Sequence, residues 1–231
     1  MINSVRTTVQ ATANKHNFGY MPPADYNLFA KQAQMEIFED IVYRYNTWLN
    51  QASARMSNAG LANIPKNILE DIEIFSASQT LTPVSGTIFS LQDDTYHVNT
   101  ITVNGKEADK ETQARILKLI NSNLTAPTAD DPVYVKTGTN IQIFPTTLSS
   151  LTVIENYIRF PKDPKWTYVS ITGGEPVFNQ SAVDYQDFEL PASYEPELCL
   201  KILSYLGISI REAELVGWST NEEIEDKNVK S

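Results

Sequence analysis

The chain has 231 residues, of which 42% are hydrophobic and 10% aromatic, and 18 Lys and Arg face 28 Asp and Glu, for a formal net charge of −10. A chain of this size covers about 70% or more of its unfolded surface on folding, so this composition excludes bulk disorder. The acidic balance and the scattered basic residues argue against a surface that grips nucleic-acid phosphates.

Cys199 is the only cysteine, which excludes a disulfide within the chain, and its leucine neighbours indicate a buried, inert thiol. Residues 1–20 contain no apolar segment of the kind found in signal peptides. No apolar run approaches the roughly 18 residues that a membrane span requires. We therefore expect a cytosolic protein with no membrane partner.

The first region, residues 1–72, is predicted to be helical. Residues 1–13 are mildly amphipathic and predict a short helix or an arm, and the Asn, Gly and paired Pro of 14–23 indicate a loop. The strongest pattern follows at 24–51 and predicts a long amphipathic helix. A short helix is expected at 65–72. The expected apolar stripe of the long helix is Leu28, Met35, Phe38, Val42, Tyr45 and Leu49, widened by Phe29, Ile37, Ile41 and Trp48.

The second region, residues 73–191, is rich in Val, Ile, Thr and aromatic residues and predicts a β-rich region of short strands. One inserted helix is expected at 110–121. Asn104-Gly105 predicts a hairpin turn, and Thr137-Gly138-Thr139 predicts another. The expected strands are 73–76, 86–91, 96–103, 132–136, 140–144, 151–160 and 166–171.

The third region, residues 192–218, contains a predicted helix at 192–206 that packs with the N-terminal helical region. Gly207 follows it at the position of a helix-ending glycine. Residues 219–231 are mostly charged and polar and predict a flexible tail. The chain is therefore predicted to be an α+β protein, with an N-terminal helical part and a C-terminal helix bracketing a β-rich middle.

The sequence offers no recognisable catalytic site. His16 and His97 are far apart, and neither has a partner at the spacing of metal ligands. The sequence lacks the glycine patterns of phosphate-binding loops and the motifs of hydrolases and metalloproteases. We expect no enzyme activity, no catalytic residue, no cofactor and no metal.

Two segments, 160–168 and 184–190, combine large aromatic rings with prolines or acids. Such rings either fill the core of the chain itself or form an interface with another protein, where aromatic side chains are enriched. Both interpretations remain open at this point. The candidate interface residues are Phe38, Tyr45, Trp48, Phe160, Trp166, Tyr168, Tyr185 and Phe188.

Three blocks of sequence, spread over nearly the whole chain, are distinctive as strings. They are NK at 14–15, GY at 19–20, Pro23, NLFAKQAQ at 27–34 and IF at 37–38; YIRFP at 157–161 and WTY at 166–168; and DYQDFEL at 184–190, EL at 197–198, KIL at 201–203 and GI at 207–208. In this order the blocks resemble the head-to-tail connector, or ring (adaptor), proteins of crAss-like and related tailed bacteriophages.

The resemblance implies a structural virion protein that forms part of the connector below the portal and lines or surrounds the DNA channel. It implies a closed ring of this chain, by analogy a dodecamer. The implied partners are the portal protein, neighbouring tail and ring proteins, and passing DNA held without sequence-specific binding. The implied location is the head–tail junction of the virion, after assembly in the host bacterial cytoplasm. The alternative is another virion or tail binding module, such as a tail-hub or fibre-adaptor protein.

Two further expectations follow from this resemblance. At −10 per copy, a closed ring is strongly acidic, and an acidic channel wall repels DNA phosphates and lets DNA slide. The terminal segments 1–13 and 219–231 are expected to be mobile in the free subunit and ordered against neighbouring chains.

Overall fold

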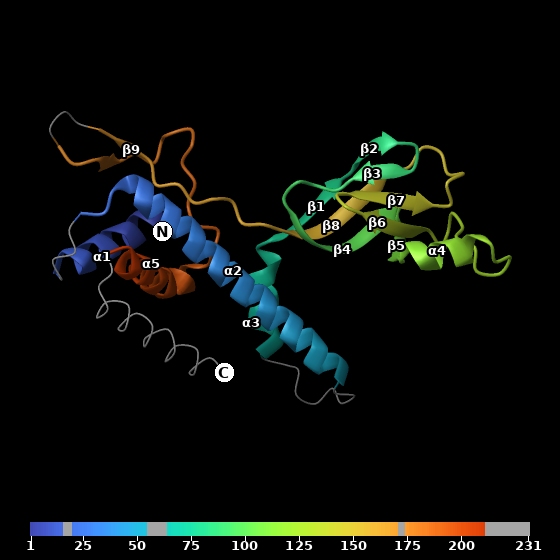
Figure 1. The fold of residues 1–231 in the computed structure, drawn as a ribbon, viewed down its shortest axis with the longest axis horizontal. Coiled ribbons are helices and arrows are strands. Elements are labelled where there is room, and N and C mark those ends of the chain that lie inside the picture. Colours follow the sequence, from blue (N-terminus) through green and yellow to red (C-terminus); the bar gives the residue numbers. More distant parts are fainter. Residues whose placement is uncertain (16–19, 55–63, 171–173, 211–231) are drawn as a thin grey trace. The chain divides into compact units, whose positions relative to one another are not determined.

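The computed structural model describes residues 1–15, 20–54, 64–170 and 174–210. It confirms the α+β fold, with N-terminal helices and a C-terminal helix flanking a β-rich middle (Figure 1). The chain divides into two compact units. The helical unit combines residues 1–74 with the described part of 161–231, and the sheet unit is the continuous segment 75–160.

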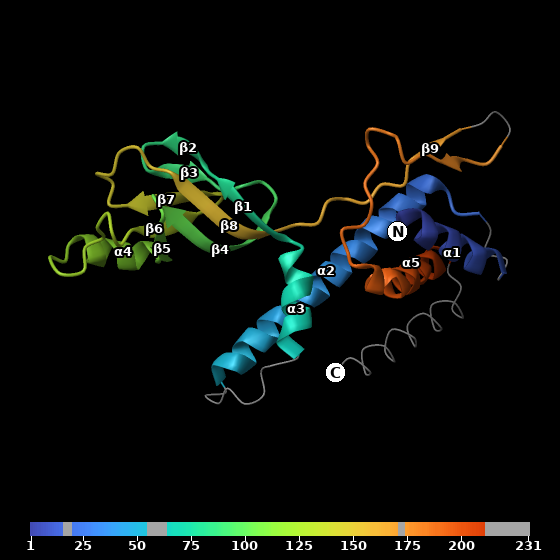
Figure 2. The ribbon, with the colours of Figure 1, turned by 180° about the vertical axis from the view of Figure 1, so that it is seen from behind.

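The helical unit begins with α1 (Ile2–Lys15), which packs against α5 (Glu195–Ile210), as Figure 2 shows from behind. The apolar residues of α1 recur every three or four positions, and their side chains are fully buried within the unit. Residues 1–13 therefore form a packed helix, and the same chain already covers its apolar face. This contradicts the expectation that the segment needs a neighbouring chain to become ordered. The buried residues are Ile2, Val5, Val9 and Ala13.

The long helix α2 (Pro23–Ala54) begins with a proline, which suits the first helical position because its missing N–H would have no partner there. Four of the expected apolar residues are buried, namely Ile37, Phe38, Ile41 and Val42. In the first turns the buried face differs from the expected stripe, since Leu28 is 64% exposed. Ala30 and Ala33 are buried on this part of α2. Because their side chains are small, they contribute little to the hydrophobic pattern from which the stripe was predicted. The buried side chains of α2 are Tyr26, Ala30, Ala33, Gln34, Ile37, Phe38, Ile41 and Val42.

Two further helical segments complete this unit, and the expected short helix is confirmed as α3 (Ile64–Glu73), which packs on α2. A short 3-10 turn, η2 (Ala192–Tyr194), leads into α5, which also packs on α2 and continues to Ile210. The prediction that Gly207 ends this helix is therefore wrong. Gly207 is buried and lies inside the helix. The expected tail, 219–231, lies outside the described residues.

The sheet unit is built from one curled sheet with the strand order β1-β8-β4-β5-β6-β7-β3-β2. The two end strands, β1 and β2, are consecutive in the chain and separated only by Leu81, whose N–H donates to the carbonyl of Val153 (2.8 Å). One bent segment therefore belongs to both ends of the sheet. The bounds are β1 (Ser76–Thr80), β2 (Thr82–Ser85), β3 (Ile88–Ser90), β4 (Thr95–Val103), β5 (Lys106–Lys110), β6 (Val133–Thr137), β7 (Asn140–Phe144) and β8 (Val153–Arg159).

The turns of the sheet unit follow the sequence closely. Asn104 and Gly105 join β4 to β5 with φ values of 50° and 80°, the two left-handed positions of the favoured hairpin turn. Gly138, with φ of 63°, lies between the paired strands β6 and β7. The strand expected at 73–76 begins only at Ser76, because α3 continues to Glu73.

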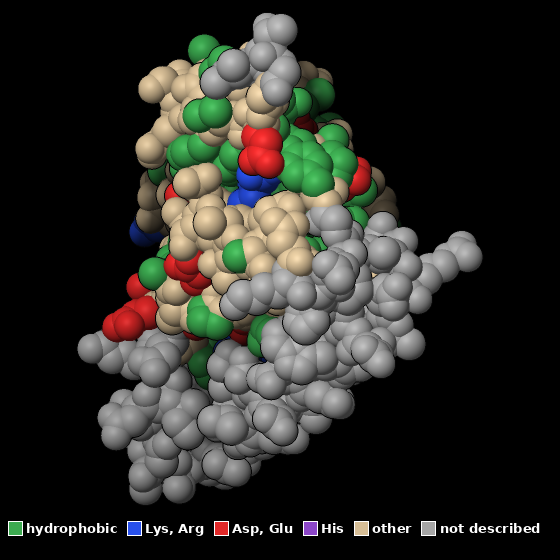
Figure 3. Space-filling model, turned by 90° about the vertical axis from the view of Figure 1, so that its left-hand side faces the viewer, with side chains coloured by type: hydrophobic (Ala, Val, Ile, Leu, Met, Phe, Trp, Pro, Cys, Tyr) green, Lys and Arg blue, Asp and Glu red, His purple; other side chains and the backbone are tan. Residues whose placement is uncertain are grey.

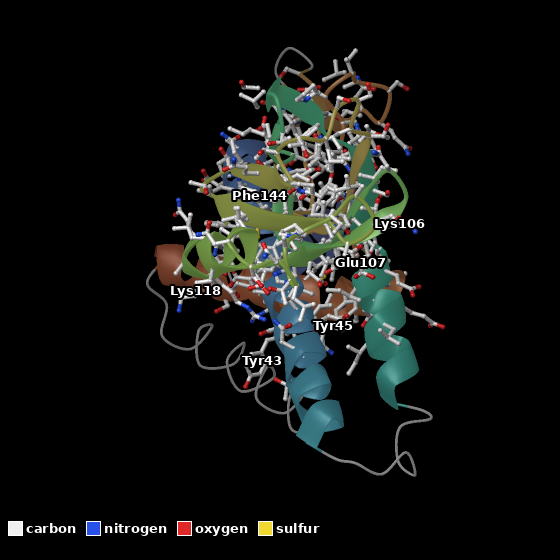
Figure 4. The ribbon with its side chains drawn as sticks, turned by 90° about the vertical axis from the view of Figure 1, so that its right-hand side faces the viewer. Tyr43, Tyr45, Lys106, Glu107, Lys118 and Phe144 are labelled. Atoms are coloured by element: carbon white, nitrogen blue, oxygen red, sulfur yellow. The ribbon has the colours of Figure 1, made fainter. Side chains whose placement is uncertain are left out.

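Inward-facing residues of these strands form one hydrophobic core. A second, smaller cluster lies under α4 (Gln113–Ile120), where Ile116 packs with Val133 and Val135, and Leu119 and Phe144 pack against them. Figure 4 labels Phe144 on β7 and Lys118 on α4. The buried core residues are Leu81, Phe89, Leu91, Ile101, Val103, Ala108, Tyr134, Ile141, Ile143 and Val153.

Residues 161–191 lie with the helical unit and not with the β-rich region to which the sequence analysis assigned them. Their strands, β9 (Tyr168–Val169) and β10 (Val177–Phe178), pair only with each other in a separate two-stranded sheet. The strand expected at 166–171 is therefore reduced to β9. Side chains of α2 bind the backbone of this segment at Trp166 and Lys162.

Candidate interaction surface

Polar side chains at positions i, i+4 and i+7 of α2 hold the proline-rich segment in place. Asn27 and the backbone of Trp166 exchange two hydrogen bonds, with Trp166 N–H donating to Asn27 Oδ1 (2.8 Å) and Asn27 Nδ2 donating to Trp166 O (3.2 Å). Gln34 Nε2 donates to Lys162 O (2.8 Å), and Glu189 N–H donates to Gln34 Oε1 (3.0 Å). Lys31 forms an ion pair with Asp163 (2.6 Å). The side-chain amides of Asn27 and Gln34 thus provide hydrogen bonds that a neighbouring strand would provide in a sheet.

Trp166 is the centre of an aromatic stack that joins this segment to α1. Its side chain is 2% exposed, and its indole Nε1 donates to Asn3 Oδ1 (3.0 Å). The Arg6 guanidinium lies 3.9 Å from the ring centroid. The same ring stacks with Tyr168 (5.7 Å between centroids) and with Phe178 (5.8 Å). The stack fixes β9 and β10 to the helical unit.

The ribbon, defined as residues 168–170 and 174–183, exposes several apolar side chains. Val169 and Val177 face each other across the antiparallel pair, and both are about half exposed. Tyr168 is exposed to a similar degree, and Val183 is fully exposed. Figure 3 shows hydrophobic side chains gathered on the face of the helical unit that carries the ribbon. Such a group of exposed apolar side chains, held in place by a packed stack, is typical of a surface that another protein covers.

A small polar pocket of about 170 Å³ opens beside the ribbon in the helical unit. Gln10 is already engaged in its wall, because its amide accepts from Met21 N–H and donates to Asn14 Oδ1. The Nε atom of Arg6 is buried without a hydrogen-bond partner, which its position over the Trp166 ring accounts for. The lining residues are Arg6, Gln10, Asn14, Tyr20, Glu175 and Pro176.

The eight candidate interface residues differ in how far their side chains are buried. Phe38, Trp166 and Phe188 are buried in the helical unit's own core, so for them the core interpretation holds. Tyr45 and Tyr185 are partly buried. The remaining three differ: Phe160 is exposed on the sheet unit beside Tyr96, Tyr168 is exposed on the ribbon, and the side chain of Trp48 lies outside the described residues.

Asp187 ties the start of α1 to the segment that follows the ribbon. Its carboxylate accepts hydrogen bonds from the Met1 amine (2.9 Å), Ile2 N–H (2.7 Å) and Phe188 N–H (2.8 Å). Burial alone would raise the pKa of this carboxyl, but the hydrogen bonds to the amine and to the two backbone N–H groups outweigh it and lower the pKa. The ionised carboxylate is therefore the form that holds α1.

Two polar clusters join the helices of this unit. Glu36 on α2 accepts hydrogen bonds from Lys201 Nζ (3.2 Å) and from the Tyr205 hydroxyl, both on α5. The hydroxyl of Tyr194 donates to Asp71 on α3 (2.6 Å) and accepts from Arg44 on α2 (3.0 Å). Burial and the bond to Asp71 raise the pKa of Tyr194 to about 12, so it remains a neutral donor. The first cluster links α2 to α5, and the second links the short turn before α5 to α2 and α3.

The titratable groups of the sheet unit and the single thiol also have structural surroundings. Glu155 on β8 is fully buried and accepts from Gln92 N–H (3.2 Å) and from the Thr95 hydroxyl (3.0 Å), and burial raises its pKa. Burial, with nearby lysines, lowers the pKa of His97. Burial raises the pKa of the Cys199 thiol to about 11. His16 lies outside the described residues.

Within the described ranges, no group of three or more His, Cys, Asp or Glu side chains is placed to hold a metal ion. Over the same ranges, no helix combines the length and the apolar composition that a membrane span requires.

Sequence reasoning missed the residues that position this surface, chiefly Asn27 and Gln34. The spacing of these two amides, seven residues apart, was the available signal, because it places them on one side of a helix. The structure shows that Gln34 is 1% exposed. A buried amide on a helix needs partners for all its polar atoms, and here the backbone of a distant segment supplies them. No protein-family model matches this sequence, and no curated protein is detectably similar to it.

Proposed function

We propose that this chain is a non-catalytic structural subunit of a phage head-to-tail connector, a ring or adaptor below the portal that surrounds the DNA channel. The observation that carries this proposal is the ribbon: the chain fixes it through Trp166 and Asn27, yet leaves Val169, Val177 and Val183 in solvent. A neighbouring virion protein, such as the portal or the next ring, would cover these side chains on assembly.

The placement of the three resembling sequence blocks supports the same proposal. Asn27 and Gln34 from the first block bind the backbone of Trp166 and Lys162, in or beside the second. The third block contributes Glu189, whose N–H donates to Gln34. The blocks that carry the resemblance therefore meet in the contacts that position the ribbon, which is what an assembly subunit would preserve.

The charge of the chain suits a ring through which DNA passes. With a net charge of −10 per copy, a closed ring would repel DNA phosphates, and DNA would slide without being held. A particle map that shows a predominantly basic channel wall contradicts this part of the proposal.

The direct test is to locate the chain in purified particles by cryo-electron microscopy and to count its copies. The proposal expects a closed ring of identical copies at the head–tail junction. A few copies elsewhere in the tail would favour the tail-hub or fibre-adaptor alternative, and substrate turnover by the pure chain would favour an enzyme.

A matched pair of variants tests the role of the ribbon itself. Val169→Lys and Val177→Lys place charges on the exposed ribbon and should prevent incorporation into particles without changing the melting temperature. Val84→Lys, on a similarly exposed valine of the sheet unit, is the control and should assemble normally. Equal incorporation of all three variants would remove the ribbon from the proposal.

A further inference from the structure

The helix α4 of the sheet unit has a second apolar face that its own unit does not cover. Ile116 faces the cluster on β6 and β7, whereas Leu117 and Ile120 are exposed, and Leu124, one turn further along, is 95% exposed. Arg115 and Lys118 are the charged residues of α4; Arg115 forms an ion pair with Glu111 (3.2 Å), and Lys118 is exposed beside Leu117. The exposed face of α4 is therefore apolar, with the basic Lys118 at its side.

The helix α2 of the helical unit presents a stripe of the opposite charge. Leu28 and Tyr43 are 64% and 71% exposed, and the partly buried Met35 lies between them on the same side of the helix. Asp25 and Glu39 are the exposed acids of this stripe. Figure 4 shows Tyr43 directed away from the axis of α2.

The basic residues of α2 leave this acidic character in place. Lys31 is paired with Asp163 (2.6 Å), and Arg44 donates to the Tyr194 hydroxyl (3.0 Å). Residues 75–160 hold six Lys and Arg and eight Asp and Glu, a net charge of −2, which leaves −8 of the −10 to the rest of the chain, so the rest of the chain is the more acidic part.

We infer that the exposed face of α4 docks onto the α2 stripe of a second copy of this chain, pairing apolar side chains inside a charge-complementary rim. The two patches differ from each other, so the contact is heterologous, and a heterologous contact generates a ring when its rotation closes. Opposite charge on the two helices sets the direction of the contact and disfavours the pairing of like patches. This inference rests on the proposed function and assigns its copy-to-copy interface.

The size of the two patches indicates that one such contact between two copies has low affinity. α4 is about 12 Å long, and the stripe from Leu28 to Tyr43 spans about 22 Å of helix at about 1.5 Å per residue. Such a contact is smaller than the about 800 Å² per partner of a stable pair. Free copies should therefore associate weakly, and ring closure or a neighbouring protein should add the remaining stability.

Cross-linking between two distinguishable copies tests the inference directly. One full-length copy carries Leu28→Cys and a second, of different tag length, carries Leu117→Cys, while the buried Cys199 stays unreactive. Mild oxidation at high concentration, or in assembled particles, should yield the mixed disulfide-linked dimer. The control pair is Leu28→Cys with Val84→Cys, which should give less than about a tenth as much product.

Charge reversal provides the second measurement, by mass photometry or sedimentation. Lys118→Glu and Glu39→Lys should each weaken self-association about fivefold, and the two changes combined in one chain should restore it to within about twofold. Raising the salt concentration should shrink all of these differences.

The possible outcomes separate this inference from the proposed function. Rings that form without the Leu28–Leu117 cross-link, and without any response to charge reversal, overturn the inference alone. A cross-link that forms only when both cysteines are in one chain shows contact within a copy and also overturns it. Failure of the chain to oligomerise under any condition, including in particles, overturns both.

Discussion

The two units of this chain differ in the internal contacts that stabilise each of them. The sheet unit is one continuous segment whose strands pair with each other, and its two ends meet where Arg159 N–H donates to Phe75 O (2.8 Å). The helical unit joins segments from both parts of the sequence through side-chain hydrogen bonds such as Gln34 to Lys162, across 128 positions. The sheet unit therefore depends on backbone pairing within one continuous segment, whereas the helical unit depends on a few polar side-chain contacts between distant segments.

The largest expected effect tests whether the sheet unit folds by itself. Phe89 is 2% exposed in its core, and Phe89→Ala should cost about 3–5 kcal/mol through lost burial and an unfilled cavity. Hydrogen exchange followed by mass spectrometry should show loss of protection across 75–160 while α1 and α5 stay protected. Tyr96→Ala, an exposed aromatic in the same unit, is the control with a small effect. Equal loss of protection in both units would mean that they unfold together.

The next effect concerns the long-range contacts of the helical unit. Gln34→Ala leaves Lys162 O and Glu189 N–H without their partner in a buried site, which should cost about 2–4 kcal/mol. Chemical unfolding should show this loss, and exchange should increase in 161–191 before it increases in the sheet unit. Gln32→Ala, an exposed glutamine on the same helix, should stay within about 0.5 kcal/mol of the parent chain. A Gln34→Ala value that small would show that the amide does not hold the segment.

Features that depend on residues close together in the sequence could be predicted, and features that depend on distant residues could not. The Asn104-Gly105 turn and the helix containing Ile116 were predictable because turn and helix signals act over a few neighbouring residues. On α2 the burial of Phe38, Ile41 and Val42 was predictable from their spacing. The burial of Ala30 and Ala33 was not, because small alanine side chains add little to a hydrophobic pattern. The burial of Trp166 depends on a distant partner, because its indole donates to Asn3, 163 positions away. Neighbouring residues therefore do not indicate whether such a ring lies in the core or at an interface.

Acid should affect the two units in opposite directions through one carboxyl in each. The pKa of Asp187 is lowered in the folded helical unit, so its contribution is present above the unfolded value of about 3.9 and is lost as pH falls through the folded value. The pKa of Glu155 is raised in the folded sheet unit, so the sheet unit gains stability from this group as pH falls through the folded value toward about 4.3. Unit-resolved hydrogen exchange between about pH 2 and pH 7 measures both slopes.

Single neutral substitutions separate these two contributions. Glu155→Gln should remove the gain of the sheet unit in acid, because the Thr95 hydroxyl can turn to accept from the new amide. Asp187→Asn should cost about 1 kcal/mol near neutral pH, since its site is partly exposed and screened by solvent. Acid slopes that do not change in either variant would assign the pH dependence to other groups.

The smallest expected effect lies at the N-terminus of α4, where Thr112 caps the helix that carries the exposed apolar face. Thr112 Oγ1 accepts from Arg115 N–H at 3.3 Å, a long bond, so Thr112→Ala should cost no more than about 1 kcal/mol. Thr112→Asp should recover the loss, because a carboxylate also caps this N-terminus and suits the positive end of the helix dipole. Hydrogen exchange at the first turn of α4 should increase in the alanine variant alone. If the same variant also weakens self-association, the register of α4 contributes to the contact between copies, because fraying at Thr112 displaces Leu117 and Lys118 without altering either side chain.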